Sequence, residues 1–191
     1  MKKILATASV LLLLITVSKS YALDVRPYFD LHAGAIAAND SDLNSNSKVS
    51  YDPGLVTGGA IGLDFELLRL EVNVDYRRAS ISQIDSAPVS GTIQLINYML
   101  NAHLVPPLQS PVKPYILLGA GLATAMVDNN NNKERDTKFS YEFGAGLGFD
   151  IKRNVTIDIN YRYMGTSDFN LNVNKLSYTT NNVLLGVRYS Y

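Results

Sequence analysis

The chain has 191 residues, and its 17 basic and 17 acidic side chains give a formal net charge of zero. This balance gives no support to nucleic-acid binding, which calls for a basic surface. Cysteine is absent and only two histidines occur, which excludes disulfide frameworks and thiol nucleophiles and limits metal sites.

The start of the chain has the three parts of a secretory signal peptide. Two lysines precede an apolar stretch at residues 4–17, and small residues stand at Ser20 and Ala22, the −3 and −1 positions of a cut after Ala22. A membrane anchor is the weaker alternative, because the apolar run is shorter than the ~20 residues that a spanning helix needs. We therefore predict a signal peptide at residues 1–22 and one domain at residues 23–191, which is either soluble or a membrane barrel.

Apolar and polar residues alternate through most of this domain, as they do in strands with two different faces. In residues 155–163, β-branched and aromatic residues alternate with Thr156, Asp158, Asn160 and Arg162. An apolar face that ends in aromatics and a polar face opposite are typical of a membrane β-barrel. The pattern predicts eight strands, at residues 26–37, 55–65, 69–78, 92–104, 113–125, 139–151, 155–163 and 183–191.

The connections between these strands alternate in length. The four connections at residues 38–54, 79–91, 126–138 and 164–182 are long and polar, and those at residues 66–68, 105–112 and 152–154 are shorter. Long loops at one end and short turns at the other are typical of outer-membrane barrels. The predicted fold is all-β, an eight-stranded antiparallel up-and-down transmembrane β-barrel. A soluble periplasmic barrel is the main alternative.

Eight strands enclose only enough space for side chains to fill, so we predict a packed polar core. Unpaired charge in such a space is costly, so the charged residues should form pairs, with Arg162 and Arg188 as central members on neighbouring strands. His32 and His103 are interpreted as core histidines, and inner-face glycines leave room for long side chains. An ion path or proton relay is the alternative hypothesis. The predicted structural network comprises Asp30, Glu71, Asp75, Arg77, Glu142, Asp158, Arg162 and Arg188.

Three segments resemble those of bacterial outer-membrane β-barrel surface proteins, the opacity-protein and OmpX-like family that includes rickettsial-type surface antigens. They are Lys113-Pro114-Tyr115, Gly144-Ala145-Gly146-Leu147-Gly148 and Asn160-Tyr161-Arg162-Tyr163. The resemblance implies the outer membrane of a Gram-negative bacterium, contact with lipid and lipopolysaccharide, and roles in adhesion, invasion or immune recognition.

The end of the chain also resembles this family. Gly186, Tyr189 and Tyr191 are similar to the signal read by the barrel-assembly machinery, a glycine followed by spaced aromatics. Family members usually end in Phe, and the usually polar position two before the glycine is Leu184 here.

Three hypotheses for function remain. The first is a monomeric, non-enzymatic surface barrel whose loops bind a host or environmental ligand. The loop after the seventh strand continues the alternation, with Phe169, Leu171 and Val173 between polar residues. This suggests that the seventh and eighth strands project beyond the membrane and offer an edge for β-augmentation. The second is a lipid-modifying enzyme, which the inward histidines argue against; the third is a small porin or channel. No catalytic residue, cofactor or metal is predicted, and the candidate partner-binding loop is Asp168, Phe169, Asn170, Leu171 and Asn172.

Overall fold

The computed structural model describes residues 25–38, 41–43, 47–84, 87–129, 132–167, 169–171, 174–176 and 178–191, and the predicted signal peptide lies outside them. The long strands are β1 (Arg26–Ala38), β4 (Gly54–Asp64), β5 (Leu68–Ile84), β6 (Ala87–Leu104), β7 (Val112–Asn129), β8 (Asn132–Lys152), β9 (Val155–Thr166) and β12 (Thr179–Ser190). Four short strands are β2 (Ser41–Leu43), β3 (Ser47–Tyr51), β10 (Phe169–Leu171) and β11 (Asn174–Leu176). Within these described ranges, no helix is both long enough and apolar enough to cross a membrane.

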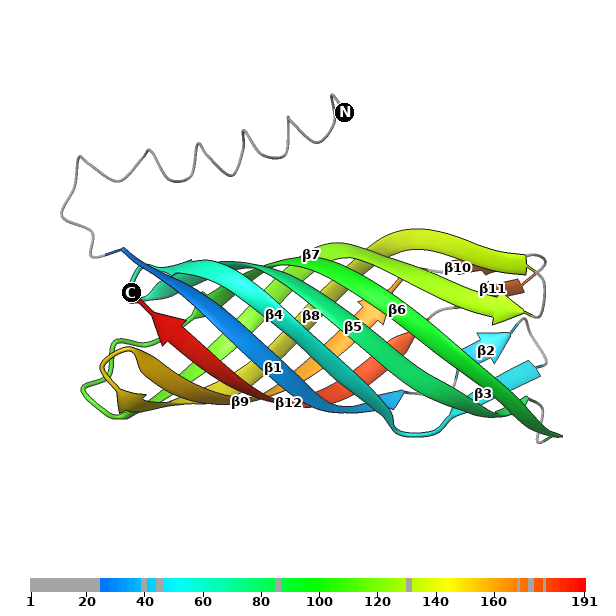
Figure 1. Cartoon of the computed structure of the whole chain (residues 1–191), viewed down its shortest axis with the longest axis horizontal. Helices are drawn as coiled ribbons and strands as arrows, with labels where there is room; N and C mark the ends of the chain where they lie inside the picture. The colour runs from blue at the N-terminus through cyan, green and yellow to red at the C-terminus, as the bar shows by residue number, and fades with distance from the viewer. Residues whose placement is uncertain are drawn as a thin grey trace, which may run out of the picture.

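The eight long strands form one closed antiparallel barrel (Figure 1). Each pairs with its neighbours in the chain, β1 pairs with β12, and the pairing of β5 with β6 completes the circle. Closure satisfies the backbone hydrogen bonds that an open sheet would leave free in lipid. The eight-stranded barrel predicted from the alternation of residues is therefore confirmed.

The outer face is apolar over the height of the barrel, as the alternation predicts. On β8 the exposed side chains include Tyr141, Phe143 and Leu147, whereas Glu142 between them is buried. Aromatic pairs occur toward both ends: Phe29 stacks on Tyr189 with ring centroids 5.6 Å apart, and Phe143 lies 4.8 Å from Tyr163. An apolar band with aromatic residues at its two borders matches the surface that a bilayer requires.

At one end of the barrel the β5–β6 and β7–β8 hairpins continue beyond the closed ring of strands, and the short β2–β3 and β10–β11 hairpins lie at the same end (Figure 1). The β5–β6 ladder continues to the pair Ile84 and Ala87, and the β7–β8 ladder to Asn129 and Asn132. These strands have 17 to 21 residues, well above the ~9–11 that cross a bilayer. The predicted loops at 79–91 and 126–138 were wrong, because polar residues above the membrane extend the backbone ladder there.

The last two strands were predicted to project. β9 and β12 have 12 residues each, and beyond them the short strands β10 and β11 pair as a hairpin at the same end of the barrel (Figure 1). Projecting backbone therefore occurs in this short hairpin as well as in the longer β5–β6 and β7–β8 hairpins. The pairing of β6 with β7 stops at Gln94 and Met126, so the two hairpins separate above that point.

The opposite end has short turns. At the β4–β5 turn Glu66 has a φ of 68°, and its backbone N–H donates to Asp64 Oδ1 at 2.9 Å. The end of the chain lies here too, because the N–H of Tyr191 donates to the carbonyl of Pro27 at 3.0 Å. In outer-membrane barrels short turns face the periplasm, so this is the periplasmic end.

The lumen is not polar throughout. Toward the projecting hairpins it is filled by apolar side chains that are at most 2% exposed, and we call this group the apolar plug. A second buried apolar group joins Ile36, Val56 and Leu184. The prediction of a wholly polar core was wrong in this half, because inward positions near the outer end carry apolar residues. The apolar plug consists of Ala79, Ile93, Leu95, Ala123, Ala125, Met164 and Tyr178.

Adjacent leucines on β12 test the two faces of the barrel. Leu184→Ala should lower the free energy of unfolding by about 2–4 kcal/mol, because it leaves a cavity against Ile36 and Val56. Leu185→Ala removes the same atoms from the outer face, where Leu185 is 59% exposed and lipid can fill the space, so we expect a loss of about 1 kcal/mol or less. Urea unfolding in detergent micelles measures both. Equal losses would contradict the assigned faces.

Candidate functional site

A charged network crosses the middle of the lumen and joins four strands. Arg77 on β5 donates from Nη2 to Asp75 Oδ2 at 3.0 Å and from Nη1 to Asn182 Oδ1 at 2.9 Å. Its Nη2 also lies 3.9 Å from Glu142 Oε2 on β8. Arg162 on β9 donates to Glu142 Oε1 at 3.2 Å. These five side chains are buried. The two arginines and the two carboxylates balance one another's charge inside the barrel.

His32 extends this network to β1. Its Nδ1 lies 2.6 Å from Asp30 Oδ1, and its Nε2 lies 2.8 Å from Asp75 Oδ1. Ionised carboxylates accept hydrogen bonds only, and a neutral imidazole has a single N–H. The group of three side chains therefore needs two protons, either on an imidazolium or shared with one carboxyl group. Among the described residues, no group of three or more metal-ligating side chains could hold a metal ion.

A second polar layer lies nearer the periplasmic end and is centred on Glu71. Tyr28 donates to Glu71 Oε2 at 3.0 Å, and Asn101 donates to Glu71 Oε1 at 3.0 Å. His103 Nε2 lies 3.2 Å from the same Oε1. Both histidines thus point inward, as the alternation predicted, and they face carboxylates, which the spacing of residues along single strands did not reveal.

Arg162 and Arg188 were predicted as central members of one network, but Arg188 lies outside the group that contains Arg162. Their strands are neighbours, but Arg162 pairs with Asn182 in the register and Arg188 pairs with Thr156. The two arginines therefore lie at different heights in the lumen. Arg188 instead lies 3.2 Å from Asp158 Oδ2, near the periplasmic end.

Sequence reasoning also missed Arg69, at the start of β5. It is 3% exposed, and its guanidinium lies 4.8 Å from the centre of the Tyr115 ring. Arg69 stands two positions before Glu71 in the same strand, and this alternation is the signal that could have placed it on the inner face. Of the buried amides Asn73, Asn97, Asn101, Asn160 and Asn182, the first four lie in predicted strands, whereas Asn182 falls in the predicted loop at residues 164–182 and belongs to β12.

Glycines on the inner face make room for this network. A Cβ at Gly58 would collide with Asp75 Oδ1 and lie 2.8 Å from His32 Nε2, and one at Gly62 would lie 2.5 Å from the Tyr28 ring. Glycine is therefore needed at these positions for side-chain space.

The comparison with known families agrees with this architecture. The family model described as outer membrane protein beta-barrel domain matches residues 7–190. The chain belongs to this family. No curated protein sequence matches it at a significant level.

Solved outer-membrane barrels share the fold. Neisserial surface protein A is 22% identical, with a TM-score of 0.67 over 86% of this chain and 97% of that one. OprG from Pseudomonas aeruginosa is 13% identical, with a TM-score of 0.59 over 87% and 96% of the two chains. AlkL, solved in lipid bilayers, is 15% identical, with a TM-score of 0.51 over 91% and 94%. At these identities the likeness concerns the fold, and family membership indicates the outer membrane of a Gram-negative bacterium.

The remaining predicted positions lie at the two ends of this family barrel. Gly186 faces the lumen, where a Cβ added to it would lie 3.0 Å from Asp30 Oδ2. The rings of Tyr189 and Tyr191 pack edge-to-face, with centroids 5.2 Å apart, on the outer surface. In the candidate partner-binding loop, the backbone of Phe169, Asn170 and Leu171 forms β10. Asp168 and Asn172 lie outside the described residues.

Substitutions of two aspartates compare how much the central network and a rim ion pair contribute to the free energy of unfolding. Asp75→Asn should lower the free energy of unfolding by about 3–5 kcal/mol, because it leaves buried Arg77 and His32 without their carboxylate. Asp64→Asn makes the same chemical change in a rim pair, where Arg26 is 38% exposed and 3.7 Å away, and should cost less than about 1 kcal/mol. Urea unfolding of the refolded barrels gives both values, and similar losses would argue against the network.

Neighbouring glycines on β4 test the need for space. Gly58→Ala should destabilise the barrel by about 2–3 kcal/mol or prevent refolding, because the added methyl group meets Asp75, His32 and the carbonyl of Val74. Gly59→Ala points to the outer face, where the added methyl group lies 3.2 Å from both Leu31 Cδ2 and the carbonyl oxygen of Asp30, without a contact below 3.0 Å, and it should destabilise the barrel much less than Gly58→Ala. The fraction that refolds, seen as a shift in gel mobility between unboiled and boiled samples, measures the difference.

Proposed function

We propose that this outer-membrane barrel is a non-enzymatic surface protein whose extracellular hairpins bind a host or environmental partner. The observation that carries the proposal is the combination of a filled lumen with strands that continue beyond the membrane. The apolar plug occupies the outer half of the lumen, and the paired carboxylates and arginines occupy its middle.

The projecting hairpins supply the surface for a partner. Along β6, residues 87–93 pair with β5 but not with β7, because that ladder begins at Gln94. On β8, pairing with β9 begins at Ser140, so residues 132–139 pair along the β7 side. Strand edges of this kind can accept an added strand through backbone hydrogen bonds. These edges of β6 and β8 support a partner contact there, and β10, in the predicted loop around Phe169, packs near β8.

A small porin or channel is the alternative function, and the lumen argues against it. Ions would have to pass side chains such as Leu95, Met164 and Tyr178, which are 0% exposed. A lipid-modifying enzyme is the other alternative. Such chemistry needs reactive groups at the outer leaflet, whereas His32 and His103 are buried with carboxylates inside the barrel.

Shortening the hairpins tests the proposal. Bacteria that display a barrel lacking residues 82–89 or residues 128–133 should adhere to cultured cells at least several-fold less than bacteria with the full barrel. Deleting residues 167–175 tests the predicted loop in the same assay. Each variant should keep its heat-dependent gel mobility, because the deletions lie outside the closed barrel.

Lys152→Gln, at the periplasmic end of β8, is the control and should leave adherence unchanged. Full adherence by all three deletion variants would refute the proposal. Steady, selective conductance of the intact barrel in planar bilayers would favour the channel instead.

A further inference from the structure

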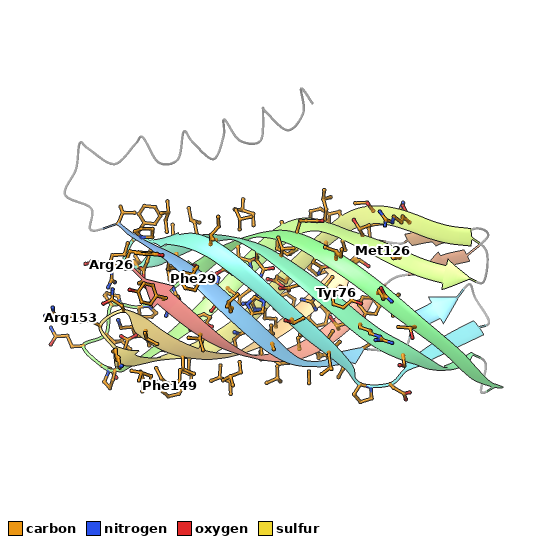
Figure 2. The ribbon with its side chains drawn as sticks, in the orientation of Figure 1. Arg26, Phe29, Tyr76, Met126, Phe149 and Arg153 are labelled. Carbon is orange, nitrogen blue, oxygen red and sulfur yellow. The ribbon has the colours of Figure 1, made fainter. Side chains whose placement is uncertain are left out.

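A polar pocket of about 370 Å³ opens at the periplasmic end of the barrel. Its walls include the start of β1, the β4–β5 turn, the segment at residues 105–109 and the β8–β9 turn. Figure 2 shows two of its residues, Arg26 and Arg153, at this end of the molecule. The charged network and the apolar plug lie between the pocket and the extracellular hairpins, so a ligand would enter from the periplasm.

The pocket has an excess of basic side chains. Its lining includes five, Arg26, Arg69, Lys113, Arg153 and Arg188, and three acidic ones, Asp64, Glu66 and Asp150. Arg26 lies 3.7 Å from Asp64, Lys113 lies 2.7 Å from Asp150, and Arg188 is held by Asp158 outside the lining. Within the described residues, Arg69 and Arg153 then remain without an ion pair of their own, and Glu66 is the remaining acidic residue of the lining.

Arg69 is the residue that marks a binding site. Its side chain is buried, with 3% of its surface exposed. Among the described residues, its Nε and Nη2 atoms have no hydrogen-bond partner. Within the described part of the chain, it has no carboxylate at ion-pair distance, and its packing partner is the Tyr115 ring. A buried guanidinium without an acceptor is costly, so an incoming oxygen ligand would gain a strong interaction there.

We infer that this pocket binds a small periplasmic solute that carries a phosphate or carboxylate group. The guanidinium of Arg69 is the principal ligand-binding group, because its planar set of N–H donors matches the oxygens of both anions. Arg153 adds positive charge at the mouth. The volume is within the range of small-molecule sites, and the site is separate from the extracellular hairpins of the proposed function.

The opposite wall of the pocket suggests what else the solute contains. Val105, Pro106, Pro107 and Leu108 line it, and the segment is fixed over the barrel end because the N–H of Val105 donates to the carbonyl of Leu67 at 2.8 Å. This wall can pack against a short apolar group attached to the anion. Inorganic phosphate and butyrate therefore serve as two probes, one with charge alone and one with charge and an apolar body.

Titration of the folded barrel in detergent micelles tests the inference. At constant ionic strength set with chloride, the Nε–H NMR signal of Arg69 should shift saturably with phosphate, butyrate or both. Arg69→Gln should weaken binding at least tenfold, measured by calorimetry. Arg153→Gln should weaken it about threefold. Lys152→Gln removes the same charge at the preceding position, the last residue of β8, but lies outside the lining, and should bind like the unmodified protein.

Several outcomes would overturn the inference: no saturable binding of either probe, or equal binding by Arg69→Gln and Lys152→Gln. If Arg69→Gln fails to refold, the comparison of Arg153→Gln with Lys152→Gln decides, together with the Arg69 signal in the unmodified barrel. Stronger binding of butyrate than of phosphate would show that the apolar wall contributes, and binding of phosphate alone would show recognition by charge.

Discussion

A polar backbone inside hydrocarbon must find all its hydrogen-bond partners within the protein, and this constraint determines the rest of the structure. The pairing of β1 with β12 satisfies it, because it joins the first and last long strands and leaves no edge in the membrane. Once the sheet is closed, alternation assigns each side chain to lipid or to the lumen. The lumen of eight strands is narrow, so every inward side chain must then be matched by its neighbours.

The lumen meets this demand differently along its length. Near the hairpins it is filled with apolar side chains such as Leu95 and Met164, which need no partner. In the middle, charges occur in compensating pairs such as Glu142 and Arg162. At the periplasmic end, compensation is incomplete, and Arg69 remains without an acceptor. The barrel thus changes from a closed apolar interior to an open polar one between its two ends.

Much of this architecture could be predicted from the sequence because its physical signal is local. Alternation within single strands gave eight strands and their faces, and it placed Asp75, Arg77 and Glu142 inside. Their partners could not be predicted, because they depend on the stagger between strands. Arg162 and Arg188 lie on adjacent strands, yet the register sets Arg188 opposite Thr156. The projecting hairpins were mistaken for loops because backbone pairing continues there without an apolar face.

The break between β6 and β7 has a consequence for how the surface of this protein can change over time. Above Gln94 and Met126 the two hairpins are no longer paired with each other, and the β5–β6 tip pairs instead with β3. Substitutions, insertions or deletions in one tip can then accumulate without disturbing the other tip or the membrane-spanning ladder. A barrel built this way can vary two segments independently, while its membrane-embedded part stays constant.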